Sequence, residues 1–237
     1  MNHSPVNIAL VPGFMLDEAL WKQLTGCLPI EHKIFHCPLG EEQTLKEISQ
    51  KAIASLPNQF VLIGFSLGGY VARQIAADHP DRVQALILIA SSLREDSVQQ
   101  TASKQHAIKA TSATTFKGLS GRTIAHSLHP KNTDDKAMVA DIQMMGQRLG
   151  YKALVTQSAI SRTGVNNDAI TCPTLIIAST HDKLRSLNEA HELTSSIANS
   201  TLITLDKSGH MIPLEQPQEL ARVITHWLSQ HTLANSQ

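Results

Sequence analysis

The residues best suited to chemistry in this sequence form a short motif around a serine. The segment Gly64–Gly68 reads GFSLG, fits the pattern G-x-S-x-G, and stands at the end of the apolar run 59–66, just before a helix-like segment. In a tight strand-to-helix turn the neighbouring backbones come so close that only glycine fits at Gly64 and Gly68. Such a turn holds the hydroxyl of Ser66 out at the end of the strand, which predicts a nucleophile. The alternative is a glycine-rich helix start; the motif lacks the G-K-S/T of a phosphate loop and the G-x-G-x-x-G of a dinucleotide site.

A serine hydroxyl needs a base that takes its proton and an acidic group that holds the base. Asp182 directly follows the apolar run 173–180, and His210 follows the run 200–206 with a glycine before it. The order Ser, Asp, His along the chain is the one expected when the serine lies on a strand-to-helix turn. We therefore expect Asp182 and His210 to complete a triad, although Asp182 could instead be a helix N-cap or a solvated loop charge. Three other carboxylates compete for the acid role: Asp206, Glu95 and Asp96.

Attack by a serine on a carbonyl builds an oxyanion, which needs hydrogen-bond donors already in place. The N–H of Leu67, at the start of the helix, is one expected donor. The second should come from the loop after the first apolar run, where Gly13 lets the backbone approach and the N–H of Phe14 is the expected donor. The N–H of Met15 is an alternative to that of Phe14 as this donor. Pro12-Gly13 also fits an ordinary turn.

The pattern around these residues predicts an α/β fold. Alternating strands and helices imply right-handed crossovers and a mostly parallel central sheet flanked by helices. Ligands of such sheets bind beyond the carboxyl ends of the strands, where Ser66, Asp182 and His210 all fall. Strands are predicted at 6–13, 33–38, 59–66, 83–92, 173–180 and 200–206, and helices at 17–28, 44–56, 67–79, 187–197 and 214–230.

The segment 94–170 interrupts this alternation and has no strong strand. Helices are predicted at 95–119, 121–128 and 134–161, the last of them interrupted near Gly150. We expect 94–170 to be a helical cap, inserted into a core domain made of 1–93 and 171–237, that roofs the site and shapes its pocket.

Met144 and Arg162 of this cap, together with Met15, are candidates for contact with a substrate. Met144, beside Met138 and Met145 at near-helical spacing, would line an apolar pocket, although ordinary packing of the cap on the core explains the spacing equally well. Arg162 would pair with a substrate carboxylate, with a structural ion pair as the alternative. His126 and His129 are three residues apart, but no acidic or cysteine cluster supports a metal site there, so we expect none.

The composition excludes several classes of protein. Among 237 residues, Lys+Arg 20 equals Asp+Glu 20, which argues against a nucleic-acid-binding protein. With 42% hydrophobic and 17% charged residues, disorder is not expected. No apolar stretch approaches the roughly 18 residues of a membrane span, and the first residues lack the features of a secretory signal. Three widely spaced cysteines suggest reduced thiols, so we expect a cytoplasmic protein.

Taken together, these residues resemble the α/β-hydrolase superfamily along nearly the whole chain. The resemblance rests on VPGF, GFSLGGYVARQIAADHPDRVQALILIAS, PTLIIASTHDK and SGHMIPLEQPQEL. It is strongest to small esterase and enol-lactonase members, which have a short helical cap between the family's strands six and seven. One departure is Pro12-Gly13, where many relatives have His-Gly.

The resemblance implies a serine hydrolase acting on a small-molecule ester or lactone, without a cofactor, as a monomer or homodimer. Two alternatives stay open. The same triad could open a lactone, hydrolyse a C–C bond or serve a lyase or synthase step, because one scaffold hosts many reactions. A member of the fold can also bind ligands without catalysis, although such proteins usually lose a triad residue.

Overall fold

Six apolar segments pair into one parallel sheet in the order β2-β1-β3-β4-β5-β6. The structure is a computed structural model that describes residues 6–29 and 31–231. Every residue of β3 and of β5 is buried, which explains why these runs are continuously apolar instead of alternating. The strands are β1 (Asn7–Val11), β2 (Lys33–His36), β3 (Phe60–Phe65), β4 (Val83–Ile89), β5 (Thr174–Ser179) and β6 (Ser200–Leu205).

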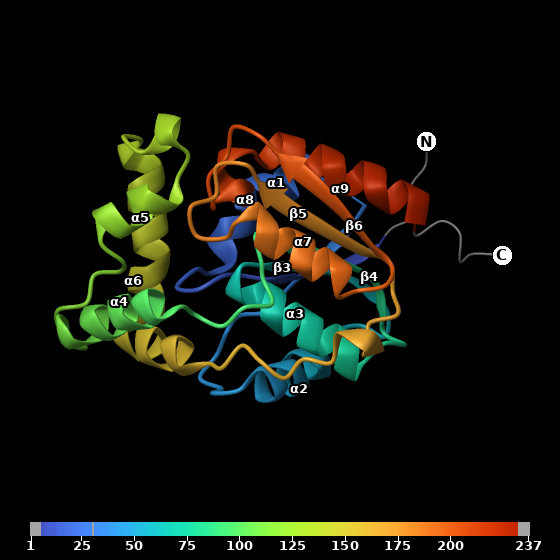
Figure 1. Cartoon of the computed structure of the whole chain (residues 1–237), viewed down its shortest axis with the longest axis horizontal. Helices are drawn as coiled ribbons and strands as arrows, with labels where there is room; N and C mark the ends of the chain where they lie inside the picture. Colours follow the sequence, from blue (N-terminus) through green and yellow to red (C-terminus); the bar gives the residue numbers. More distant parts are fainter. Residues whose placement is uncertain (1–5, 30, 232–237) are drawn as a thin grey trace.

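Helices cover both faces of this sheet, as Figure 1 shows. Successive side chains of a strand point to opposite faces, so Val61 and Ile63 of β3 pack with one set of helices, and Leu62 with the other. One face is covered by η1 (Glu18–Trp21), α1 (Lys22–Cys27), α8 (Ile212–Glu215) and α9 (Pro217–His231). The opposite face is covered by α2 (Leu45–Ser55), α3 (Leu67–Asp78) and α7 (Leu187–Ser195).

The chain between β4 and β5 forms a helical insertion at one end of the sheet (Figure 1). In the numbering of this six-stranded sheet, the insertion lies between the fourth and the fifth strand. The insertion packs onto the core through Ile124, Leu128, Ile142 and Met145, which join the apolar cluster under α1 and α9. Its helices are α4 (Val98–Lys109), α5 (Gly121–Ser127), η2 (Pro130–Asn132), α6 (Lys136–Ala159) and η3 (Asn167–Ala169).

Several local signals of the sequence are confirmed by these elements. The helix predicted at 44–56 is α2, and Thr44 and Glu47 form a capping box at its start. The expected interruption of the long helix is a kink in α6 at Gly150, whose φ of 81° lies in the left-handed region. None of the helices in the described ranges is both long and apolar enough to cross a bilayer.

Three predicted helices differ from the structure. The helix expected at 17–28 is divided into the 3₁₀ helix η1 and the short α1. The helix expected at 95–119 is shorter, because Ser97 caps α4 and the chain leaves it after Lys109 to reach Gly118 at a φ of 87°. The closing helix expected at 214–230 is divided into α8 and α9 at Gln216, because Pro217 has no N–H to continue the first helix.

Candidate active site

Ser66 lies on a strained turn between β3 and α3. Its φ of 51° and ψ of −113° are unusual for a residue with a side chain. The turn is fixed from β4, because the N–H of Ser66 donates to the carbonyl of Ile89 at 2.9 Å and the hydroxyl of Ser91 donates to the carbonyl of Ser66 at 3.0 Å. The Ser66 side chain makes no capping bond to α3, so its hydroxyl is free for other partners.

The glycines on both sides of Ser66 are required by close backbone contacts. A Cβ at Gly64 would lie 2.5 Å from the carbonyl oxygen of Gly68. A Cβ at Gly68 would lie 2.3 Å from the carbonyl oxygen of Val11 and 2.4 Å from that of Pro12. The turn therefore packs directly against the loop after β1, and these contacts leave space only for glycine at Gly64 and Gly68, as the sequence predicts.

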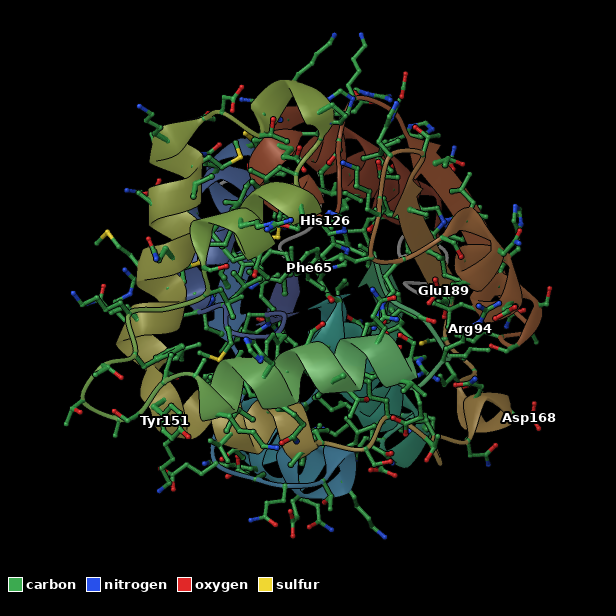
Figure 2. The ribbon with its side chains drawn as sticks, turned by 60° about the vertical axis from the view of Figure 1, so that its left-hand side comes forward. Phe65, Arg94, His126, Tyr151, Asp168 and Glu189 are labelled. Carbon is green, nitrogen blue, oxygen red and sulfur yellow. The ribbon has the colours of Figure 1, made fainter. Side chains whose placement is uncertain are left out.

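The side chains of Ser66, His210 and Asp182 form a continuous line of hydrogen bonds. Nε2 of His210 lies 3.0 Å from Oγ of Ser66, and Nδ1 of His210 lies 2.7 Å from Oδ2 of Asp182. The side chains of His210 and Asp182 are 7% and 1% exposed, so water cannot compete freely for these bonds. The ring centre of His210 also lies 5.1 Å from that of Phe65, the last residue of β3, which is labelled in Figure 2 in a view toward the insertion.

Asp182 is held by its own loop, and this fixes which oxygen faces His210. Oδ1 accepts the N–H of Leu184 at 2.7 Å and that of Arg185 at 2.9 Å, which leaves Oδ2 for the imidazole. The competing carboxylates have other partners. Asp206 accepts the hydroxyl of Thr180 at 2.9 Å and is largely exposed. Asp96 pairs with Lys104 and Arg162, and Glu95 accepts the hydroxyl of Ser161 and the N–H of Arg162.

The loop after β1 lies beside Ser66 and carries the two N–H groups that were candidates for the second oxyanion donor, those of Phe14 and Met15. The N–H of Met15 is occupied, because it donates at 2.7 Å to the side-chain oxygen of Gln157 on α6. Within the described residues, the N–H groups of Phe14 and Leu67 donate to no protein atom. This arrangement favours Phe14 over Met15 as the partner of Leu67 in an oxyanion hole. Gln157 was missed by the sequence analysis, since nothing in the pattern links it to a loop 142 residues away.

The candidate substrate contacts are placed differently from one another. Met15 is 1% exposed at the seam between the core and α6. Met144 is 51% exposed on α6, whereas the next residue, Met145, is buried and belongs to the core cluster. Arg162 is 4% exposed, and its guanidinium pairs with Asp96 of the insertion, so the structural ion pair that the sequence left open is the one observed.

A buried charged group lies next to Phe14. Lys104 of α4 shares the carboxylate of Asp96 with Arg162, and its ammonium lies 4.8 Å from the centre of the Phe14 ring. Burial, together with the positive charge of Arg162, lowers the pKa of the Lys104 ammonium from 10.5 to about 8, although Asp96 opposes this shift. At neutral pH the charged Lys104 is therefore a source of instability.

This lowered pKa predicts a pH-dependent stability. Between pH 8 and 10.5 the unfolded chain binds more protons than the folded one, so the contribution of Lys104 to stability rises with pH, and its full cost is present below pH 8. We expect Lys104→Met to unfold at least about 2 °C above the wild type at pH 7, because methionine fills the same space without a charge. Thermal unfolding from pH 6 to 10 should show this gap closing as the wild type titrates, and a gap independent of pH would contradict the argument.

The described part of the chain contains no group of three His, Cys, Asp or Glu residues that could hold a metal ion. His126 is exposed on α5, whereas His129 is buried and its ring packs against that of His181 with 4.6 Å between ring centres. Nδ1 of His129 accepts the N–H of Lys131 at 3.1 Å. These two histidines therefore have different surroundings and do not form a pair.

A parallel sheet flanked by helices, with a serine on the turn after β3, defines the class of α/β hydrolases. A family model described as alpha/beta hydrolase fold matches residues 45–217, which is well over half of the chain. The chain belongs to this family.

Comparisons with individual proteins agree with this assignment. A pimeloyl-(acyl-carrier protein) methyl ester esterase of Vibrio atlanticus is 32% identical over 94 residues, which cover 36% of this chain and 36% of that protein. An esterase of Thermogutta terrifontis has a TM-score of 0.80 at 23% identity, over 98% of this chain and 92% of the other. The enol-lactonase of Burkholderia xenovorans has a TM-score of 0.80 at 16% identity, over 96% and 92%. The match to the curated relative thus spans about a third of that protein's length. The two solved structures have the same fold as this chain.

Proposed function

We propose that this protein is a serine hydrolase that cleaves small carboxylic esters through an acyl-enzyme intermediate. The proposal is carried by the hydrogen-bonded line from Ser66 to His210 at 3.0 Å and from His210 to Asp182 at 2.7 Å, which begins at a serine held in a strained turn. This geometry meets the distance criterion for a nucleophile, its base and the group that orients the base.

In the first half of the proposed reaction, Ser66 attacks the ester carbonyl. With Nδ1 of His210 protonated and donating to Asp182, Nε2 is free to take the proton of the Ser66 hydroxyl. The imidazolium formed in this step is stabilised by the carboxylate of Asp182, and it then gives its proton to the leaving alcohol. The N–H groups of Phe14 and Leu67 stabilise the developing oxyanion, a contribution that amounts to about 10²–10³ in kcat for a single donor in other enzymes.

In the second half, a water molecule replaces the alcohol. His210 takes a proton from this water, the water attacks the acyl group on Ser66, and collapse of the second tetrahedral intermediate returns the proton to the Ser66 hydroxyl. These steps balance without a metal or an electron-transfer cofactor, so the proposal includes neither.

The surroundings of the triad have proposed roles as well. Residues 94–170 would act as a cap that excludes water from the site, and buried Met15 would contact the substrate. The three cysteines of the described residues are free, which suits a reducing compartment and supports our expectation of a cytoplasmic location.

The proposal predicts covalent labelling of Ser66 and turnover of activated esters. A fluorophosphonate reacts with an activated serine, so we expect one label per chain, at Ser66. p-Nitrophenyl esters of increasing acyl length should be hydrolysed with saturation and should define the preferred chain. The panel should also contain simple methyl esters, because the curated relatives are named as methyl ester esterases.

The same panel tests the alternatives. Five- and six-membered lactones compared with open-chain esters of equal carbon number would reveal a lactonase, if kcat/KM were higher for the ring. A folded protein that is neither labelled nor active on any ester or lactone would instead support a ligand-binding role without catalysis.

A further inference from the structure

The carboxylate of Glu215, at the end of α8, connects two segments that are far apart in the sequence. Oε1 accepts the N–H of Gly209 at 2.9 Å and lies 3.5 Å from the hydroxyl of Ser208, both in the loop that carries His210. Oε2 accepts the N–H of His129 at 2.7 Å and the side-chain amide of Asn132 at 2.9 Å, both in the insertion. One oxygen therefore holds the histidine loop and the other holds the insertion.

The backbones of these two segments also touch directly. The N–H of His210 donates to the carbonyl of Ser127 at 2.7 Å. A Cβ at Gly209 would lie 2.5 Å from the backbone nitrogen of His129 and 2.5 Å from the carbonyl carbon of Leu128. A larger residue at position 209 would collide with the backbone of the insertion. The insertion therefore packs directly against the residue that precedes the proposed base.

Few other contacts hold this loop. The hydroxyl of Ser179 donates to the carbonyl of Ser208, and the amide of Gln216 donates to the carbonyl of Lys207 at 3.2 Å. Lys207 itself has a φ of 60°, so the loop is not relaxed where it leaves β6. The contacts through Glu215 and Ser127 lie closest to His210, and they come from α8 and from the insertion.

We propose that Glu215 is a positioning residue through which the insertion sets the place of His210 between Asp182 and Ser66. This inference rests on the proposed function, because it takes His210 as the base. A carboxylate suits the role since it only accepts hydrogen bonds, and the three N–H groups that face it, those of Gly209, His129 and Asn132, can only donate. Along Ser127–Asn132 the insertion is therefore a fixed part of the active site and does not open as a lid.

The decisive variant is Glu215→Gln, which keeps the size of the side chain. Whichever way the new amide is turned, its NH₂ group faces donors, either at Gly209 or at His129 and Asn132, so one side of the bridge is lost. We expect kcat for p-nitrophenyl acetate to fall about 10- to 100-fold, as for other small displacements of catalytic groups. KM should change much less, since Glu215 has no contact with the proposed substrate site.

Two further variants separate positioning from general stability. Glu219→Gln is the matched control, because it makes the same change four residues later. Among the described residues the carboxylate of Glu219 pairs with Arg222 alone, on the surface of α9, so kcat should be unchanged. Asn132→Ala removes one donor on the insertion alone and should lower kcat by about three- to tenfold. The hydrogen-bonded proton between His210 and Asp182 can be followed by NMR as a far-downfield resonance. This resonance should be shifted or broadened in Glu215→Gln and unchanged in Glu219→Gln.

The outcomes distinguish this inference from the proposed function. If the wild type is active and a folded Glu215→Gln variant has the same kcat and the same downfield resonance, the inference alone is overturned. A wild type without hydrolytic activity would overturn the proposed function, and the inference with it. If Glu215→Gln does not fold, Asn132→Ala decides: a lowered kcat with a perturbed resonance supports the positioning role, and wild-type values overturn it.

Discussion

Replacement of Ser66 by alanine is expected to lower kcat for ester hydrolysis by about 10⁵- to 10⁶-fold while the protein stays folded. The variant keeps the expected oxyanion donors but has no oxygen to form the acyl-enzyme. The contacts that fix the turn involve the backbone of Ser66 and not its hydroxyl, so alanine should be accommodated in the same conformation. The residual rate should reflect binding and the oxyanion hole alone.

Steady-state hydrolysis of p-nitrophenyl acetate and labelling by a fluorophosphonate measure this effect. Ser91→Ala is a suitable control, because Ser91 is a buried serine whose hydroxyl contacts the carbonyl of Ser66 and not the imidazole of His210. We expect this control to be labelled at Ser66 and to lose at most about tenfold in kcat. A Ser66→Ala variant that kept more than a few per cent of the wild-type rate would place the nucleophile elsewhere.

The residues that meet at the site could be predicted because their chemistry and their position in the fold are both visible in the sequence. Ser66 directly follows β3, Asp182 and His210 lie in the loops after β5 and β6, and strands of one parallel sheet present their carboxyl ends at one edge. The need for glycine at positions 64 and 68 could also be predicted, since close packing at a strand-to-helix turn leaves space for nothing larger.

The contacts within the insertion could not be predicted in this way. Near-helical spacing shows that Met144 and Met145 lie on neighbouring faces of α6, but the spacing does not say which face meets the core. Gln157 and Glu215 are held by partners 142 and 86 residues away, and no periodicity records such pairs. The division between α8 and α9 had a usable signal in Pro217, which cannot donate the hydrogen bond that a continuous helix needs.

Asp182→Asn is the second large expected effect, with a loss of about 10⁴ in kcat, the magnitude known for the same change in another serine triad. The reason is specific to the loop of Asp182. Its Oδ1 accepts the N–H groups of Leu184 and Arg185, so the oxygen of an asparagine must stay there and its NH₂ group must face His210. The imidazole would then accept at Nδ1 and carry its proton on Nε2, where it can no longer take the proton of Ser66.

We expect that the other carboxylates considered for the acid role can be replaced with little effect on ester hydrolysis. Asp206→Asn alters an exposed side chain bonded to Thr180, and Asp96→Asn weakens the ion pairs of Lys104 and Arg162. Neither carboxylate contacts His210, so kcat should stay within about tenfold of the wild type in both variants. If Asp206→Asn or Asp96→Asn were crippled while Asp182→Asn kept its activity, the acid of the triad would have been assigned to the wrong residue. Because asparagine preserves the shape of aspartate at all three positions, a loss confined to Asp182→Asn would mean that the proton on His210 must be held at Nδ1, by a carboxylate, for Ser66 to react.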